Sequence, residues 1–189
     1  MERYLTHETR LIYVRSGEQV EPSEFLDVDA IVVGGGPTPA YLEGLQPATD
    51  TIRAAVNDGV SYLGFSAGAM IAPAMAIVGG YMYAERQVCP EEWSEGLDGV
   101  TVRPGLGLTT IGIDVHAAQA GILGRAVSAV HSGLLAEVAA IDEDTALVLD
   151  QNKKQPTGVI GSGSTWMISK AHERTSVSVS SATQRDACA

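Results

Sequence analysis

The sequence predicts an α/β protein with a mostly parallel sheet, flanked by helices on both faces. Two apolar runs carry this prediction, because residues 30–33 lead into three glycines and residues 62–65 lead into a second small-residue turn. A helix is expected between them over 51–56, ended by Gly59. Strand, glycine turn and helix in alternation indicate βαβ units, whose ligands bind at the carboxyl ends of the strands.

The remaining segments are expected to extend this fold. The small and apolar residues 117–130 suit a helix, and the chain from 175 to 189 is alternating at first and then polar, with a frayed end. The segments 137–141 and 145–149 flank an acidic turn and predict a C-terminal β-hairpin. Further strands are expected at 11–14, 110–114, 159–161 and 165–169.

Composition limits the class of protein. The 189 residues suit a single domain over 1–189, and no apolar run is long enough to cross a membrane. The first residues lack the apolar stretch of a signal peptide, so we expect a cytoplasmic protein. A net charge of −11 argues against nucleic acid as a partner. The two cysteines, Cys89 and Cys188, fit no metal pattern, and no motif requires a metal or other cofactor.

Residues 64–69, with the sequence G-F-S-A-G-A, have the pattern of a nucleophile elbow. A serine hydroxyl is a useful nucleophile only where a sharp turn lifts it clear of the backbone. Such a turn leaves almost no room for side chains two residues to either side, hence Gly64 and Gly68. Ser66 is therefore the candidate nucleophile.

A serine nucleophile needs a base and an acid that orients the base. Of the histidines at 7, 116, 131 and 172, only His116 follows a predicted sheet strand, which brings it to the edge where the elbow lies. For the acid we favour Glu85, which lies between Ser66 and His116 in the sequence. Asp114 and Asp98 are alternatives, although Asp114 is too close to His116 to orient its ring easily.

The oxyanion that develops during acyl transfer needs backbone amides beside the serine. We expect one amide from Gly36, in the neighbouring glycine turn, and one from Ala67, directly after the nucleophile.

Four segments together resemble the serine peptidases that include aspartyl dipeptidase (dipeptidase E) and cyanophycinase. Residues 29–36 are similar to the family's oxyanion strand, and 64–69 to its elbow. Asp114 and His116 with Gly121, Gly124 and Arg125 resemble its histidine segment, and 141–147 its I-D-E-x-T-A-L hairpin. These matches follow the family's order over about residues 28–169.

The resemblance implies a fold similar to class I glutamine amidotransferases, which is flavodoxin-like, and peptide hydrolysis through an acyl-enzyme. Ser66 and His116 carry over directly, and Glu85 carries over by neighbourhood. Gly35 and Thr38, in the glycine turn, become candidates for substrate contact. The implied partner is a small peptide substrate.

Three departures from the family distinguish this chain. Only 33 residues precede Gly34, so we expect either a reduced N-terminal βα unit or a trimmed chain, and an open sheet edge leads us to expect a homodimer. Pro37 and Thr38 replace a pair that begins with asparagine. Ala117, Ala120 and Ile122 stand where cyanophycinase has a phenylalanine and two arginines, which weighs against cyanophycin and a preference for aspartyl peptides.

The sequence thus predicts a serine-type hydrolase that cleaves a peptide or isopeptide bond in short or acidic peptides. Two alternatives remain open: a catalytically inactive member that serves as a binding or assembly domain, and an esterase of the α/β-hydrolase fold. The second is disfavoured because that fold needs more strands before its elbow.

Overall fold

The structure is a computed structural model, and it describes residues 8–150, 156–171 and 174–182. The end of the expected frayed tail, from residue 183, lies outside the described residues, as do His7, His172 and Cys188.

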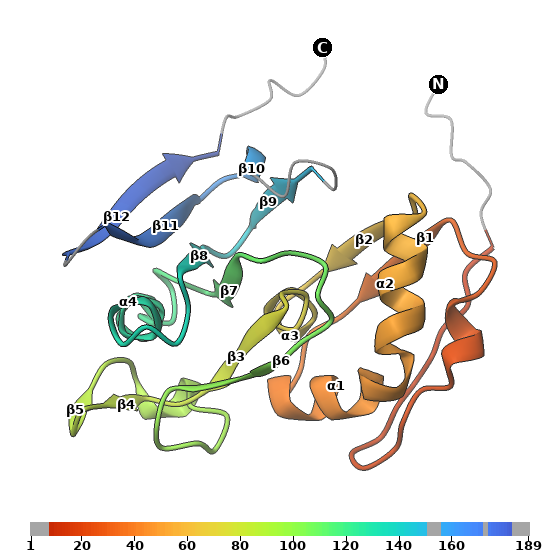
Figure 1. Cartoon of the computed structure of the whole chain (residues 1–189), viewed down its shortest axis with the longest axis horizontal. Coiled ribbons are helices and arrows are strands. Elements are labelled where there is room, and N and C mark those ends of the chain that lie inside the picture. Colours follow the sequence, from red (N-terminus) through yellow and green to blue (C-terminus); the bar gives the residue numbers. More distant parts are fainter. Residues whose placement is uncertain (1–7, 151–155, 172–173, 183–189) are drawn as a thin grey trace.

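Strands make up most of the regular structure (Figure 1). In chain order they are β1 (Ala30–Val33), β2 (Ser61–Gly64), β3 (Met75–Gly79), β4 (Met82–Tyr83), β5 (Arg86–Gln87), β6 (Thr101–Pro104), β7 (Gly112–Val115), β8 (Glu137–Ile141), β9 (Thr145–Leu149), β10 (Pro156–Gly161), β11 (Ser164–Ala171) and β12 (Arg174–Ser181). The α-helices are α1 (Thr38–Leu45), α2 (Thr49–Asn57), α3 (Ala67–Met70) and α4 (Leu123–His131). Short 3₁₀ turns lie at Pro22–Phe25, Gln46–Ala48 and Glu91–Trp93.

The strands form several small sheets in place of one continuous, mostly parallel sheet. Among the described residues, parallel pairing links β1 to β2 and β7 to β8, and the other named strand pairs are antiparallel. The largest sheet has the order β12-β11-β8-β7. The two parallel pairs are the ones that end at the candidate site, because β2 leads to Ser66 and β7 to His116.

The β1–β2 pair is covered on one face. Ile31 and Val33 of β1 are buried against Ile52 and Val56 of α2 and their neighbours. On the other face Val32, opposite Leu63 in the parallel register, is 70% exposed. The expectation of helices on both faces therefore fails for this pair, since no helix in the described part of the chain packs on that face.

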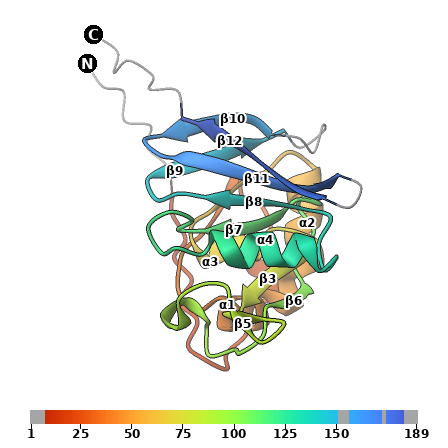
Figure 2. The ribbon, with the colours of Figure 1, turned by 90° about the vertical axis from the view of Figure 1, so that its left-hand side faces the viewer.

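The four-stranded sheet carries α4 on one side (Figure 2). Apolar residues of α4, β7 and β8 share a core in which Ala126, Val130 and Val138 have no exposed surface. The helix predicted over 117–130 is shorter than expected, because the chain turns at Gly121, whose φ is +67°, before α4 starts at Leu123. Glycine at that position permits the left-handed turn without strain.

Two strand predictions need correction. The hairpin expected from 137–141 and 145–149 is not formed, because β8 lies between β7 and β11 while β9 pairs with β10. Residues 11–14 are not a strand: they find no strand partner among the described residues, and Tyr13 is 85% exposed. The residues from 174 to 181, which include the alternating start of the tail, form strand β12 paired along β11.

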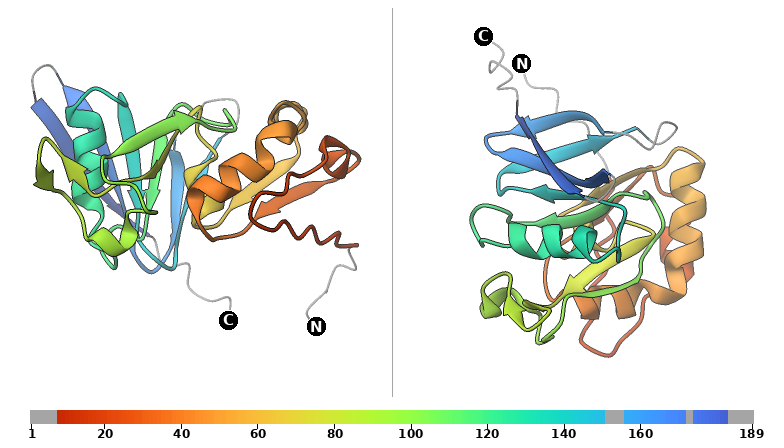
Figure 3. Two further views of the ribbon diagram at one scale, coloured as in Figure 1. Left: turned by 90° about the horizontal axis from the view of Figure 1, so that it is seen from below. Right: turned by 60° about the vertical axis from the view of Figure 1, so that its left-hand side comes forward.

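Two apolar cores meet at β3 and α3. In the left view of Figure 3, the red and orange N-terminal segment and the blue C-terminal strands lie on opposite sides of the molecule. Alternate residues of β3 point to opposite sides, so Ile77 belongs to the core of α4 and the four-stranded sheet, while Val78 belongs to the core of β1, α1 and α2. Met70 and Ile71 divide in the same way. The elbow therefore sits where the two cores join.

Candidate active site

The elbow serine stands at the carboxyl end of β2 in a strained turn. Ser66 has φ 52° and ψ −114°, outside the regions that L-residues favour, and α3 starts at the next residue. The turn is tied to β1, because the Phe65 amide donates to the Val33 carbonyl at 2.9 Å and the Gly68 amide to the Gly34 carbonyl at 3.0 Å. This backbone lifts the Ser66 side chain away from the sheet.

The two elbow glycines are needed for close backbone approach. A Cβ on Gly64 would lie 2.5 Å from the Gly68 carbonyl oxygen, and a Cβ on Gly68 would collide with the Val33 carbonyl oxygen. The lack of room for side chains two residues from the serine, expected from the sequence, is therefore observed. Side chains there would push apart β1, β2 and α3.

His116 follows β7 directly and faces Ser66. Its Nε2 lies 3.1 Å from Ser66 Oγ, and its Nδ1 lies 3.0 Å from Oε1 of Glu143. A carboxylate only accepts hydrogen bonds, so Nδ1 carries the proton that donates to Glu143. In the neutral ring Nε2 is then free to accept from the serine hydroxyl, which is the tautomer that a general base requires.

Glu143 lies in the turn after β8, and a carboxylate beside it holds that turn. Asp142 is buried, and its Oδ1 accepts hydrogen bonds from the Ala118 amide and from Trp166 Nε1. The Glu143 amide donates to Oε1 of Gln119 at 2.9 Å. These bonds join the turn after β8 to the chain that follows His116, so histidine and carboxylate are held in one unit.

A buried ion pair supports the histidine from the other side. Arg125 donates to both carboxylate oxygens of Asp114, at 2.6 and 2.8 Å, and its third nitrogen donates to the Trp93 carbonyl at 2.5 Å. The Trp93 ring lies against the His116 ring, with centroids 5.2 Å apart. Asp114 has no exposed surface, so it orients an arginine rather than the histidine ring.

The carboxylate beside His116 is not that of Glu85, the acid expected from the sequence. Glu85 is exposed in the turn between β4 and β5, with φ +62°, and makes no hydrogen bond or ion pair with the described residues. The carboxylate that the structure brings to Nδ1 of His116 is that of Glu143. The parallel pairing of β7 and β8 brings the residues after both strands to one edge, whereas the sequence predicted that 137–141 would pair with 145–149.

The expected oxyanion amides lie next to the serine. Gly35 is packed against it, since a Cβ there would lie 2.8 Å from Ser66 Cβ and 3.4 Å from Oγ. Within the described part of the chain, the amides of Gly36 and Ala67 donate no hydrogen bond. Unpaired N–H groups beside a nucleophile are free to receive a developing negative charge.

Thr38 does not fit the expected role in substrate contact. Its side chain is buried, with 1% exposure, and its hydroxyl donates to Oε1 of Glu95 at 3.0 Å. Thr38 therefore fastens the start of α1 to the loop after Trp93. Gly35 is exposed and remains available to a substrate.

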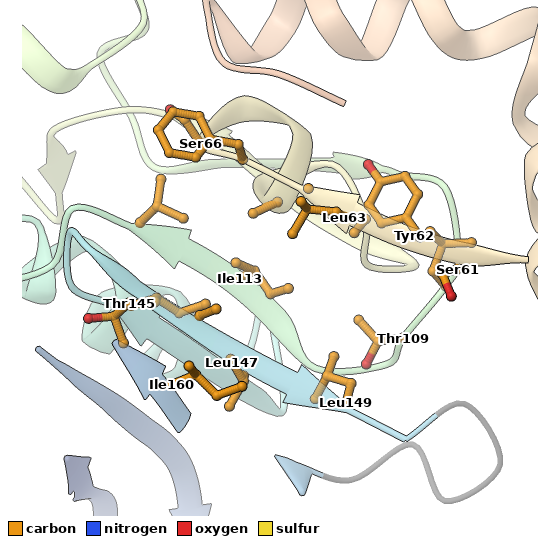
Figure 4. A pocket seen from close by; sticks show the side chains of 18 of the residues that line it. Ser61, Tyr62, Leu63, Ser66, Thr109, Ile113, Thr145, Leu147, Leu149 and Ile160 are labelled. Atoms are coloured by element: carbon orange, nitrogen blue, oxygen red, sulfur yellow. The ribbon is translucent and has the colours of Figure 1, made fainter. Parts of the chain in front are cut away.

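A cavity of about 790 Å³ opens beside Ser66 and His116 and extends along β2. Ser66 lies at one end, and Ser61, Thr109 and Leu149 lie at the other (Figure 4). Aliphatic and aromatic side chains form most of its wall. They include Leu63, Phe65, Leu108, Ile113, Val115, Ile141, Leu147, Leu149 and Ile160.

Among the residues that the structure describes, the charged ones that line the cavity are acidic, namely Asp142, Glu143, Asp144 and Asp150. Neither these carboxylates nor any other three His, Cys, Asp or Glu side chains in the described ranges are grouped as metal ligands. Cys89 is buried, and burial raises the pKa of its thiol, which disfavours a thiolate nucleophile. In the same ranges, none of the helices is long and apolar enough to span a membrane.

An elbow serine, a histidine within hydrogen-bond reach and a carboxylate behind it form the kind of site that serine hydrolases have on α/β folds. The comparison with protein families agrees with this class. The model of peptidase family S51 matches residues 11–156, and the chain belongs to this family. The resemblance inferred from the motifs is thereby confirmed, and membership supports a serine peptidase-like hydrolase.

Solved structures show the same fold. A peptidase from an acI-B1 Actinobacterium superposes with a TM-score of 0.56 at 19% sequence identity. The match covers 85% of this chain and 62% of that chain, so the protein described here spans less than two thirds of the length of that peptidase. None of the curated proteins matches the sequence.

Proposed function

We propose that the protein is a serine peptidase that cleaves short peptides through an acyl-enzyme. The observation that carries the proposal is the continuous hydrogen-bond chain from Ser66 through His116 to Glu143, with the serine on a strained elbow. Family membership supports the same class of reaction.

Each residue of this chain has a defined role in the proposed mechanism. Ser66 Oγ attacks the peptide carbonyl carbon while its proton passes to Nε2 of His116. The amides of Gly36 and Ala67 stabilise the oxyanion. His116 then donates the proton to the leaving amine, and the C–N bond breaks to leave an acyl ester on Ser66. Water, deprotonated by His116, releases the acid product and restores the serine.

Glu143 orients the imidazole and stabilises the imidazolium that forms in both steps. Its contact with Nδ1 fixes the tautomer in which Nε2 is the base. Trp93, against the ring of His116, and the Arg125–Asp114 pair that holds the Trp93 carbonyl limit the motion of the base.

The cavity favours substrates with apolar or basic side chains over acidic ones. Its wall is mostly apolar, and the charged side chains that line it within the described ranges are carboxylates. An acidic side chain would lose hydration there and meet like charges. The sequence led us to expect short or acidic peptides as substrates. Of these, we propose short peptides without an acidic residue at this subsite.

Labelling with a fluorophosphonate probe tests the mechanism. The wild-type protein should react at Ser66, and Ser66→Ala and His116→Ala should abolish or greatly slow the reaction. A folded wild-type protein that does not react would overturn the proposed peptidase and would favour the inactive binding domain.

A panel of matched coumarin amides of leucine, lysine and aspartate tests the substrate preference. We expect leucine or lysine to exceed aspartate by about tenfold or more in kcat/KM, the scale of a modest difference in binding free energy. A preference for aspartate would contradict the proposed substrate class while leaving the serine mechanism intact.

A further inference from the structure

The glycine turn after β1 carries one of the two amides proposed for the oxyanion hole, and its orientation has a specific cause. The turn borders Ser66 through Gly35, whose Cα has no room for a side chain beside the serine. A peptide with small residues on both sides can rotate readily, so its N–H direction needs a fixed partner.

Two hydrogen bonds hold the carbonyls of this turn. The Gly34 carbonyl accepts from the Gly68 amide at 3.0 Å, and the Gly35 carbonyl accepts from the Tyr41 hydroxyl at 2.7 Å. A trans peptide is planar, and its N–H points opposite to its C=O. Gly68 therefore orients the amide of Gly35, and the Tyr41 hydroxyl orients the amide of Gly36.

Tyr41 is itself held firmly against the turn. Its ring lies on Gly36, because a Cβ on that glycine would be 2.6 Å from Tyr41 Cε2. Tyr41 is in the first turn of α1, where its amide donates to the Pro37 carbonyl at 3.1 Å. The first turn of α1 is also anchored by the buried Thr38, whose hydroxyl donates to Glu95.

We propose that Tyr41 is a positioning residue of the oxyanion hole, which aims the Gly36 amide at the carbonyl oxygen of the substrate. The inference rests on the proposed function and adds to it a residue that lies outside the matched motifs. It acts through the Gly35–Gly36 peptide and does not touch the reacting atoms.

Tyr41→Phe removes the hydroxyl and keeps the ring against Gly36. Tyr83→Phe is the control, because Tyr83 makes an edge contact with His131 and lies on β4, away from the elbow. We expect Tyr41→Phe to lower kcat about tenfold with KM unchanged, because losing an oxyanion donor outright costs about 10²–10³ in kcat and here the donor stays but is less fixed.

A tetrahedral adduct gives a readout that a purely structural role would not change. N-acetyl-leucinal with ¹³C at the aldehyde carbon adds to Ser66 Oγ, and the hemiacetal hydroxyl is then titrated by NMR. We expect the pKa of that hydroxyl to be higher in Tyr41→Phe than in the wild type and in Tyr83→Phe, because a weaker oxyanion hole stabilises the anion less.

The outcomes separate this inference from the function on which it rests. If the wild type forms the adduct and Tyr41→Phe has the same kcat and the same hemiacetal pKa, the positioning role is overturned and the peptidase stands. If the wild type forms neither the adduct nor the fluorophosphonate ester, the proposed function is overturned, and so is the positioning role of Tyr41. If Tyr41→Phe loses both thermal stability and activity while the hemiacetal pKa is unchanged, the role of Tyr41 is structural and the positioning role is overturned.

Discussion

Ser66 and His116 both adopt left-handed backbone conformations, with φ of 52° and 62°. For residues other than glycine such strain costs about 1–3 kcal/mol each and persists only where the surroundings enforce it. Here the surroundings are the carboxyl ends of two parallel strand pairs, since Ser66 follows β2 and His116 follows β7. The strain turns both side chains toward each other instead of along their strands.

The carboxylate that orients His116 can be tested by a matched pair of substitutions. Glu143→Gln keeps the shape but removes the charge and the fixed tautomer, so the rate of fluorophosphonate labelling should fall about 10²-fold or more. Glu85→Gln should label at the wild-type rate, because Glu85 lies in the exposed β4–β5 turn. Loss of labelling in Glu85→Gln with normal labelling in Glu143→Gln would reverse the assignment.

The Arg125–Asp114 pair should contribute far more to stability than an exposed ion pair. Arg125→Met leaves the Asp114 carboxylate buried without a partner, which should lower the free energy of unfolding by about 3–5 kcal/mol. Arg103→Met breaks the exposed pair with Glu43 and should cost less than about 1 kcal/mol. Urea denaturation of the two variants checks the contrast, and similar midpoints would contradict it.

Local sequence patterns predicted where strands lie in the sequence better than which strands pair with one another. The run 30–33 is β1, the run 62–65 overlaps β2, and the glycines that follow them form the turns they were expected to form. The segment 137–141 is a strand as expected, yet it pairs with β7 and β11 instead of β9. Apolar runs and turn residues are local signals, whereas pairing depends on which strands the whole chain brings together.

The elbow depends on contact between three elements through glycine. Gly68→Ala would force β1 away from α3, because the new Cβ meets the Val33 carbonyl. We expect the free energy of unfolding to fall by about 1–3 kcal/mol, with slower fluorophosphonate labelling. Gly99→Ala is the control, since nothing lies within 4 Å of a Cβ there and its stability should change little. Equal stability of the two variants would show that the elbow tolerates a side chain.

At the scale of the whole molecule, the candidate site joins two apolar cores. Ser66 is attached to the core of β1, α1 and α2, and His116 to the core of α4 and the four-stranded sheet. Their 3.1 Å contact therefore depends on β3 and α3, which contribute residues to both cores. Activity is expected only when both cores are folded.

The stability of the molecule should fall in alkaline solution through Tyr62. Burial raises the pKa of Tyr62, whose hydroxyl donates to the Gly68 carbonyl at 2.7 Å. Above about pH 10 the unfolded chain loses this proton and the folded chain keeps it. The free energy of unfolding then falls with rising pH, by up to about 1.4 kcal/mol per pH unit for this group.

Urea denaturation between pH 8 and pH 11 checks this expectation. At pH 8, Tyr62→Phe should be less stable than the wild type, because the substitution removes the hydrogen bond of the Tyr62 hydroxyl. The difference in the free energy of unfolding should shrink as the pH rises past 10. Two curves that fall in parallel would show that other groups cause the alkaline loss.

The family, the elbow with Ser66, and His116 as the partner of that serine could be predicted from the sequence. These follow from glycine spacing and from residues at the ends of apolar runs, signals that act over a few neighbouring positions. Only the tertiary structure brought Glu143 to His116, buried Thr38, and set the Tyr41 hydroxyl on the Gly35 carbonyl. Each of these contacts depends on packing between separate elements, and the spacing of residues along one segment does not encode which distant segment will lie beside it.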